Sequence, residues 1–183
     1  MAETRLLDDY RPWPFRITET RLEFALAPRG TVVRSEIAME RSGPGPLVMD
    51  GGAGLRTRAV AIDGRPVDPA HLTIGAESLS IAEAALPDRP FTFAAEVEID
   101  PADNTALEGL YLSGGMFCTQ CEAEGFRHIT WYPDRPDVMA PFRVMVRSDL
   151  PVLLSNGNPV AQGQGGAEWH DPWPKPAYLF ALV

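Results

Sequence analysis

One segment, GGMFCTQCEAEGFR at positions 114–127, combines thiol, amide and carboxylate side chains that could bind a ligand or react with it. It holds the two cysteines of the chain, Cys118 and Cys121, together with Gln120 and Glu122. Because successive side chains of a strand point to opposite faces, a strand continuing through this segment would place Gln120 and Glu122 on one face and Cys121 on the other. A carboxylate two residues from an amide side chain on the same face is suited to bind an ammonium group.

The Cys118-x-x-Cys121 spacing raises two chemical interpretations. A thioredoxin-type pair needs its first cysteine at a helix N-terminus in an α/β context, and a structural zinc site needs four converging ligands, usually from two such pairs. The sequence meets neither condition, because the pair stands alone and His71, His128 and His170 are scattered without an H-E-x-x-H motif. We therefore interpret the cysteines as reduced thiols partly packed in a loop, and each histidine as a surface or hydrogen-bonded residue.

The secondary structure predicted around this segment consists of short strands. Alternation of apolar with polar residues, or a short apolar run before a turn, predicts strands at 22–26, 33–39, 60–62, 79–81, 91–99, 110–113 and 116–119. Turn signals separate them at 28–30, at Asp63-Gly64 and at Gly114-Gly115, and the last two are dipeptides that favour tight hairpins.

Many short strands with frequent turns predict an all-β fold, an antiparallel sandwich, and the 18 prolines and 16 glycines suit it. The helical content is expected to be one or two short turns at most. One such turn is expected from Asp134 to Met139, where an acidic N-cap precedes Pro136. We expect residues 1–183 to form a single domain, because no repeat or second domain is visible.

Composition excludes several classes of protein. The 45% hydrophobic content is enough for a continuous core. The formal net charge of -9 would repel a phosphate backbone, so we expect no nucleic-acid partner. No stretch approaches the roughly 18 apolar residues of a membrane span, and the start, MAETRLLDDY, lacks the basic and apolar regions of a signal peptide. With only two cysteines, these features predict a cytoplasmic protein that does not bind membranes.

The last nine residues, KPAYLFALV, form an apolar, strand-like segment. Such a segment would leave hydrogen-bonding groups and side chains without partners if the polypeptide stopped there. We therefore expect the natural chain to continue past Val183. The alternative is a buried edge strand that ends the protein.

Four runs of sequence resemble one known family: NTALEGLYLSGG, CTQCEAEGFRHITWYPDRPDVMAPF, PVLLSNGNPVAQG and WHDPWPKPAYLFALV. From Asn104 to Val183 the chain closely resembles the N-terminal domain of the bacterial aminopeptidase N family, which are zinc alanyl aminopeptidases of the gluzincin type. Before Asn104 the resemblance is looser and rests on Tyr10-Arg11-Pro12 and Asp63-Gly64, while the Gly- and Pro-rich stretch 41–58 is not diagnostic. Trp131 and Pro133 depart from the family pattern.

The resemblance implies a saddle-shaped β domain, antiparallel or mixed, that lies over a thermolysin-like catalytic domain. That catalytic domain carries H-E-x-x-H, a further glutamate ligand and a G-A-M-E-N loop, and none of these motifs occurs in residues 1–183. We therefore expect no cofactor in this fragment and no activity from it alone. The zinc of the parent enzyme would be held by residues downstream of Val183, and the implied partners are peptide substrates and the chain's own catalytic domain.

The resemblance also assigns roles to individual residues. Glu122 matches the acid that grips the free α-ammonium of the substrate, and Gln120 matches a residue that lines the same subsite. Glu124 resembles a structural position that pairs with Arg127. The nearby Asp134, Arg135 and Asp137 are expected to form a turn network that fixes the loop.

Three alternative interpretations fit the sequence less well. The leukotriene-hydrolase branch looks similar but reads glutamine where Glu122 stands, so Glu122 favours a plain aminopeptidase. A non-catalytic β-sandwich that serves as an interaction module would have no physical need to keep an ammonium receptor. A Cys-x-x-Cys redox or zinc protein conflicts with the expected strand parity and the ligand count.

Overall fold

The computed structural model describes residues 7–183, so the first six residues of the acidic start lie outside the described residues. The strands are β1 (Phe15–Ala25), β2 (Thr31–Arg41), β3 (Leu47–Asp50), β4 (Arg56–Ile62), β5 (Arg65–Pro66), β6 (Leu72–Ile74), β7 (Ser78–Ile81), β8 (Phe91–Ile99), β9 (Gly109–Ser113), β10 (Met116–Gln120), β11 (Met139–Arg147), β12 (Asn158–Gly163) and β13 (Gly166–Pro176). The 3-10 helices are η1 (Leu7–Asp9), η2 (Pro69–His71), η3 (Glu83–Ala85), η4 (Pro101–Asp103), η5 (Phe126–His128) and η6 (Ala177–Leu179).

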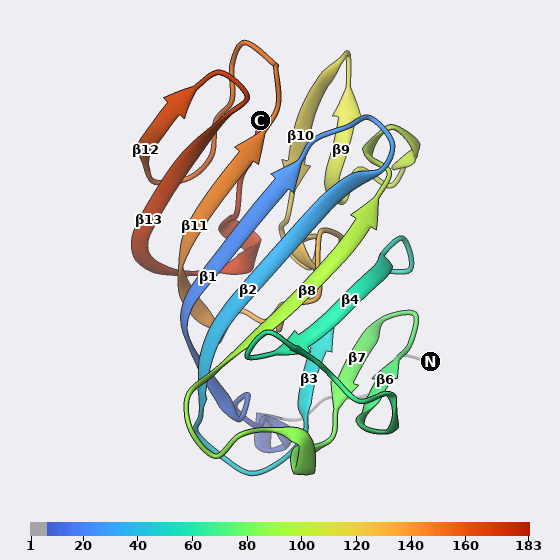
Figure 1. The fold of residues 1–183 in the computed structure, drawn as a ribbon, viewed down its shortest axis with the longest axis vertical. Coiled ribbons are helices and arrows are strands. Elements are labelled where there is room, and N and C mark those ends of the chain that lie inside the picture. The colour runs from blue at the N-terminus through green and yellow to red at the C-terminus, as the bar shows by residue number, and fades with distance from the viewer. Residues whose placement is uncertain (1–6) are drawn as a thin grey trace.

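One large sheet organises the fold. Its eight strands lie in the order β12-β13-β11-β1-β2-β8-β4-β5, and their long members run diagonally across Figure 1. The β1–β11 pair is parallel, with Thr20 opposite Phe142, and the other pairs of this sheet are antiparallel. The predicted all-β, mixed fold is therefore confirmed.

Two smaller sheets complete the sandwich. The β9–β10 hairpin lies near one end of the large sheet and the three-stranded sheet β3-β7-β6 lies toward the other end (Figure 1). Their apolar side chains, among them Phe117 on β10 and Leu79 on β7, belong to the same core as Phe24 and Phe93 of the large sheet. The hairpin is thus held to the large sheet by burial of its apolar face.

Strand β1 changes the face of its side chains part-way along. Phe15 and Ile17 are buried, and so are Leu22 and Phe24, although the two pairs differ in parity. The pairing register with β2 shifts between Ile17 and Glu19, which marks a β-bulge. A bulge inserts one extra residue and so exchanges the two faces of a strand, which lets both halves of this long strand face the core.

The tight turns predicted from dipeptides are confirmed. Asp63 and Gly64 have φ values of 50° and 73°, and Gly114 and Gly115 have φ values of 57° and 86°. Positive φ at both central residues defines the type I′ turn, whose twist matches that of hairpin strands. The second of these turns reverses the chain between β9 and β10 and so determines where the segment after β10 begins.

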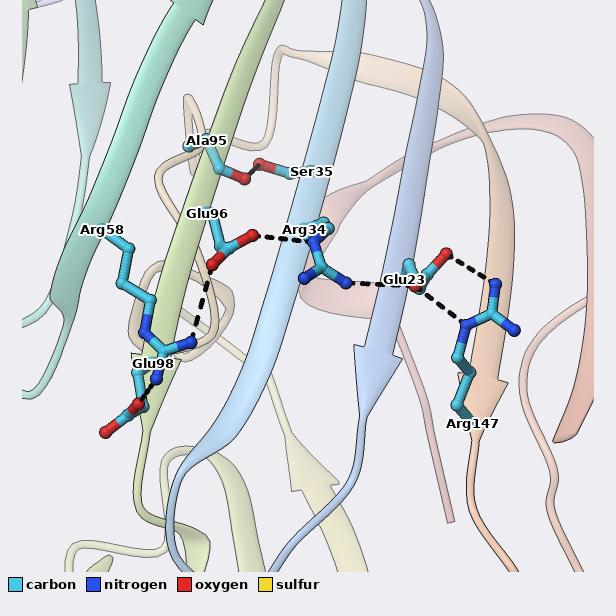
Figure 2. Close-up of polar contacts among 8 residues, drawn as sticks. All are labelled: Glu23, Arg34, Ser35, Arg58, Ala95, Glu96, Glu98 and Arg147. Carbon is cyan, nitrogen blue, oxygen red and sulfur yellow. Dashed lines mark hydrogen bonds and ion pairs between the residues drawn. The ribbon is translucent and has the colours of Figure 1, made fainter. Parts of the chain in front are cut away.

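The outer face of the large sheet carries a ladder of ion pairs that crosses five strands (Figure 2). Arg147 on β11 contacts Glu23 on β1 at 2.9 Å, and Glu23 contacts Arg34 on β2 at 3.3 Å. Arg34 then contacts Glu96 on β8 at 2.7 Å, and Glu96 contacts Arg58 on β4 at 3.6 Å. Each such pair contributes little stability because it is solvated, but together they keep this face polar.

Two expectations about helical turns are wrong. Residues 134–139 contain a turn at Pro136–Asp137 rather than a helix, and β11 begins at Met139. The described chain also has six 3-10 segments of three residues each, more than the one or two short turns expected. The reason at 134 is that the Asp134 carboxylate accepts a hydrogen bond from the earlier Arg127 amide, and so is not used to cap residues after it. No helix within residues 7–183 is long and apolar enough to cross a bilayer.

Asp100, which lies just after β8, forms a further ion pair with Arg56. Acid titration of Asp100 tests how much this pair contributes to the stability of the fold. Arg56, which donates to Asp100 at 2.6 Å, and the Gly30 amide lower the pKa of this carboxyl to about 2. A carboxylate whose pKa is lowered in the folded protein stabilises the fold at pH values above its ordinary pKa. This stabilisation is lost as the pH falls through the pKa of the folded state. Asp100→Asn should therefore lower the free energy of unfolding at pH 6, and its difference from wild type should vanish toward pH 2.

Urea unfolding measured from pH 6 to pH 2 gives this comparison. Glu77→Gln is the control, because its exposed carboxylate lies outside the ion pairs of residues 7–183. The control should run parallel to wild type at every pH. A constant difference between Asp100→Asn and wild type across the titration would show that Asp100 does not stabilise the fold through its charge.

Candidate functional site

Strand β10 ends at Gln120, and Glu122 lies in the turn that follows it. The expectation that the strand continues through Glu122 is therefore wrong. The turn is closed by a hydrogen bond from the Gly125 amide to the Cys121 carbonyl at 2.9 Å. A Cβ atom at Gly125 would lie 2.2 Å from the Gln120 carbonyl oxygen, so only glycine lets the chain fold back this closely.

The turn brings Gln120 and Glu122 together. The Gln120 Nε2 atom donates a hydrogen bond to the backbone carbonyl of Glu122 at 3.1 Å. Both side chains are exposed while Cys121 between them is buried, so the alternation expected for a strand persists although the strand has ended. The peptide bond between Glu122 and Ala123 is cis. The Glu122 carboxylate is thus exposed at the surface, and the Gln120 side chain holds the backbone of Glu122 in place.

The two cysteines are free thiols in different surroundings. Cys118 is partly exposed on strand β10, not at a helix N-terminus, and its thiol faces the Met116 carbonyl at 3.8 Å. Burial raises the pKa of Cys121 to about 12, so its thiol stays protonated at neutral pH. These positions agree with two reduced, packed thiols and disagree with a redox pair.

Residues 7–183 contain no group of three or more His, Cys, Asp and Glu side chains placed to hold a metal ion. The donors near the turn are Glu122, Glu124 and Cys121, and the last points into the core while the first two face solvent. The zinc that the resemblance implies therefore does not fit this part of the polypeptide.

The segment after the turn is fixed by an aromatic cluster. Phe126, in η5, is fully buried, and its ring centroid lies 4.9 Å from Tyr132, 5.2 Å from Phe180 and 6.0 Å from Phe142. Rings at these separations in edge-to-face geometry attract one another beyond the effect of burial alone. Because Phe142 lies on β11 of the large sheet, the cluster ties the Glu122 turn to the centre of the fold.

A buried carboxylate holds the same segment from its other side. Asp134, only 4% exposed, accepts from the Arg127 amide at 3.0 Å and from Arg127 Nε at 3.3 Å. Burial raises the pKa of Asp134, and the Arg127 contacts oppose that rise. Arg127 also contacts Glu124 at 3.3 Å, which confirms the predicted structural pairing. The amide of Asp134 in turn donates to the Asp50 carboxylate at 2.9 Å.

The predicted turn network is confirmed for Arg135 and Asp137 but not for Asp134, whose carboxylate contacts Arg127 instead. Arg135 donates to both carboxylate oxygens of Asp137, at 2.8 and 2.9 Å, and Tyr10 donates its hydroxyl to Asp137 at 2.8 Å. Arg135 also donates to the backbone carbonyl of Arg11 at 2.9 Å. The network therefore joins the start of the described chain to the segment before β11.

Trp131, which departs from the family pattern, is a core residue here. Its side chain is 1% exposed, and its Nε1 donates to the Thr57 hydroxyl at 2.9 Å. The ring lies over Gly51, where a Cβ atom would be 2.0 Å from it. This departure thus concerns packing in the core, against Gly51 and Thr57.

One anchor of β10 was not predicted from the sequence. The Thr119 hydroxyl donates to the Leu182 carbonyl at 3.2 Å and accepts from the Leu182 amide at 2.8 Å. The C-terminal segment that was expected to be a strand forms η6 and then a single bridge between Leu182 and Ser155. No local signal marks the contact, because Thr119 and Leu182 are far apart in sequence.

The exposed turn lies outside the hollow that forms beside η4 and β9. That hollow, of about 400 Å³, is lined by residues that include Asp100, Glu108 and His128. Neither Gln120 nor Glu122 lines it. The Glu122 carboxylate therefore lies on an open surface of the described chain, and groups from elsewhere are needed to enclose it.

Comparison with known proteins gives a consistent result. A family model described as the Peptidase M1 N-terminal domain matches residues 68–179. Aminopeptidase N of Caulobacter vibrioides is 55% identical over 186 residues, which cover 97% of this chain and 21% of that protein. Aminopeptidase N of Escherichia coli is 47% identical and covers 96% of this chain and 21% of that protein.

A solved structure supports the same assignment. The crystal structure of Legionella pneumophila aminopeptidase A, in complex with aspartic acid, has a TM-score of 0.87 and 27% sequence identity. The match covers 97% of this chain and 22% of that one. The chain thus spans about a fifth of the length of the relatives it matches. These matches confirm the family predicted from the sequence, and this chain belongs to the peptidase M1 N-terminal domain family.

Proposed function

We propose that this chain is the N-terminal domain of a zinc aminopeptidase and that it supplies the binding site for the substrate's free α-amine. Glu122 binds the ammonium group, Gln120 lines the same subsite, and the domain packs over the catalytic domain of the same polypeptide. The observation that carries the proposal is the exposed Glu122 carboxylate, held in a closed turn beside Gln120. Similarity to aminopeptidase N over nearly the whole chain supports the reaction class.

The chemistry of this pair suits an exopeptidase. A free α-amine is an ammonium ion with three N–H donors, and an ionised carboxylate accepts such bonds strongly. Gln120 uses its Nε2 to hold the Glu122 backbone, so its Oε1 can accept a further N–H from the same ligand. A peptide whose amine is acylated offers no charge to Glu122, and the site therefore selects chain ends.

The strength of this selection depends on exclusion of water. A charge-assisted hydrogen bond contributes about 1.5–3 kcal/mol, which corresponds to roughly ten- to a hundredfold in binding. At an open surface the interaction is weakened by the high dielectric constant of water. Enclosure of Glu122 by the catalytic domain would therefore make the amine site effective.

The reaction itself belongs to residues outside this chain. Zinc ligands do not fit within residues 7–183, so bond cleavage is not assigned to any residue described here. The contribution of this chain is to bind and orient the substrate's first residue. Correct orientation of the reacting group is itself a large part of catalysis.

Removing the charge of Glu122 tests the amine site. In the parent enzyme, Glu122→Gln should raise KM for alanyl p-nitroanilide about ten- to a hundredfold, because one charge-assisted bond of roughly 1.5–3 kcal/mol is lost. The urea midpoint should stay unchanged, since the side chain is exposed. Glu124→Gln is the matched control, which removes the same charge from the same turn and should leave KM within about twofold.

Two results would count against the ammonium role. One is an equal rise of KM in the Glu124→Gln control. The other is a parallel loss of stability and activity in Glu122→Gln, which would make Glu122 a structural residue. A catalytically indifferent Glu122 in a stable protein would favour the alternative, a β-sandwich that acts only as an interaction module.

Loss of the Arg127 guanidinium should affect stability rather than recognition. Arg127→Met leaves the buried Asp134 carboxylate without its charged partner, and breaking such a pair costs about 3 kcal/mol or more. Arg21→Met is the control, since Arg21 pairs with Glu19 in an exposed contact that is worth about 0–1 kcal/mol. Urea unfolding of the 183-residue chain measures both. Equal destabilisation by the two changes would contradict the structural role of Arg127.

Separation of the binding domain from the metal site gives another test. The isolated chain should bind no stoichiometric zinc and should not hydrolyse alanyl p-nitroanilide, because its donors do not converge. A version extended through the next domain should bind about one zinc and cleave the substrate. Elemental analysis measures the zinc content of both proteins, and an absorbance assay measures their hydrolysis of alanyl p-nitroanilide. Zinc binding with hydrolysis by the isolated chain would overturn the assignment.

A further inference from the structure

The hairpin that ends at the amine site has no backbone ladder to the large sheet. Strands β9 and β10 form a two-stranded sheet of their own, and within residues 7–183 neither strand pairs with the eight strands of the large sheet (Figure 1). A two-stranded hairpin is at best marginally stable by itself, so side-chain contacts must fix where it lies. The position of Gln120, the last residue of β10, therefore depends on contacts made beside the strand.

The side chains of β10 are divided between two faces of the hairpin. Phe117 is buried in the core, and Thr119 lies on the same face because it follows two residues later in the strand. Gln120 is exposed and belongs to the opposite face. The Thr119 side chain therefore does not reach a ligand bound at Gln120, and it can affect such a ligand only through the position of the strand.

The Thr119 hydroxyl both donates to and accepts from the backbone of one buried residue. It donates to the Leu182 carbonyl at 3.2 Å and accepts from the Leu182 amide at 2.8 Å, and Leu182 is fully buried. These two bonds restrain movement along β10 as well as away from it, because a shift in either direction would lengthen at least one of them. Valine has a similar shape but can form neither bond, whereas serine can form both.

The segment that receives these two bonds is held in turn by the loop before β12. Asn156 accepts a hydrogen bond from the Ala181 amide at 2.6 Å and donates one to the Leu179 carbonyl at 3.2 Å. The next residue, Gly157, lies against β13 of the large sheet, since a Cβ atom there would be 2.4 Å from the His170 carbonyl oxygen. This loop thus connects the C-terminal segment to the large sheet, and the threonine hydroxyl connects β10 to the C-terminal segment.

We propose that Thr119 is a positioning residue for the amine site, and that its hydroxyl fixes the end of β10 so that Gln120 and Glu122 are aligned with the substrate's α-amine. The inference rests on the proposed function and adds to it a residue that touches no substrate. A shift at the end of β10 reaches the turn directly, because Gln120 Nε2 donates to the Glu122 carbonyl at 3.1 Å. Hydrogen bonds weaken steeply when their angles are distorted, so a small displacement of the Glu122 carboxylate lowers its affinity for an ammonium group.

Steady-state kinetics of the parent enzyme separate positioning from a loss of folded protein. Thr119→Val should raise KM for alanyl p-nitroanilide about three- to tenfold, because a misaligned Glu122 keeps only part of a charge-assisted hydrogen bond. Partial unfolding would instead lower the apparent kcat and leave KM unchanged, since the molecules that remain folded bind normally. Thr119→Ser should restore KM to within about twofold of wild type. Thr18→Val is the matched control, because Thr18 donates one hydroxyl bond to the Ala38 carbonyl within the large sheet, and it should leave KM unchanged.

A double-mutant cycle shows whether Thr119 acts through Glu122. Thr119→Val should have little further effect on KM in the Glu122→Gln background, because both changes weaken the same bond to the substrate. Full additivity of the two changes would overturn the proposal, and so would an equal rise of KM in Thr119→Ser. If urea unfolding shows that Thr119→Val does not fold, Asn156→Ala replaces it in the cycle under the same criterion, because it releases the C-terminal segment from its other side.

Failure of this inference and failure of the proposed function give different results. If Glu122→Gln leaves KM unchanged, the amine site itself is refuted, and the positioning role of Thr119 is refuted with it. If Glu122→Gln raises KM while Thr119→Val leaves it unchanged, the amine site stands and Thr119 is only a structural residue of the hairpin. A rise of KM in both single variants, without additivity in the double variant, supports both conclusions.

Discussion

The packing of Phe126 is the contact on which the candidate site depends. Its ring meets Tyr132, which follows shortly after it in the chain, Phe142 on β11 and Phe180 near the C-terminal end of the sequence. Burial of one such side chain is worth about 1.5–3 kcal/mol, and here it also fixes where the preceding turn can lie. Glu122 is four residues from Phe126, so packing of Phe126 in the core also restricts where the exposed Glu122 carboxylate lies.

Two carboxylates close to this contact differ in how much of their charge is used within the fold. Asp134 is buried and receives both an amide and a guanidinium from Arg127, so its charge is fully used within the fold. Glu122 is exposed, and only its backbone carbonyl is held, by Gln120. A carboxylate whose oxygens already accept hydrogen bonds within the fold binds a further cation weakly. The Glu122 carboxylate remains available to accept hydrogen bonds from a ligand.

Strands with clean alternation were predictable from the sequence. The predicted 91–99 strand coincides with β8, because every second residue from Phe91 to Ile99 enters the core. Strand β1 was only half predicted, since its bulge exchanges the two faces and hides the period of its first part. Strands β11, β12 and β13 were not predicted, and of these β12 is exposed along its whole length and offers no apolar pattern.

The sequence predicted that Gln120 and Glu122 lie near one another, but not the geometry of the turn that brings them together. The family resemblance assigned the roles that are proposed for them, and these roles stay a prediction. The end of β10 could not be read locally, because the fold-back depends on how closely Gly125 approaches the Gln120 carbonyl. The bond between Thr119 and Leu182 joins residues far apart in the chain, and sequence patterns do not encode such pairings.

The parallel pairing of β1 with β11 has a consequence for the order in which the molecule can be assembled. Strand β1 cannot pair with β11 until β11 has been synthesised, more than a hundred residues later, as the register of Thr20 with Phe142 shows. Strands β1, β2, β8 and β4 can pair as soon as they leave the ribosome, because their contacts involve earlier or nearby segments. The ring of Phe142 and the segment around Phe180 arrive last. A nascent chain would therefore hold most of its large sheet while the Glu122 turn was still unformed, and this turn would be fixed only when the C-terminal segment packed beside β10.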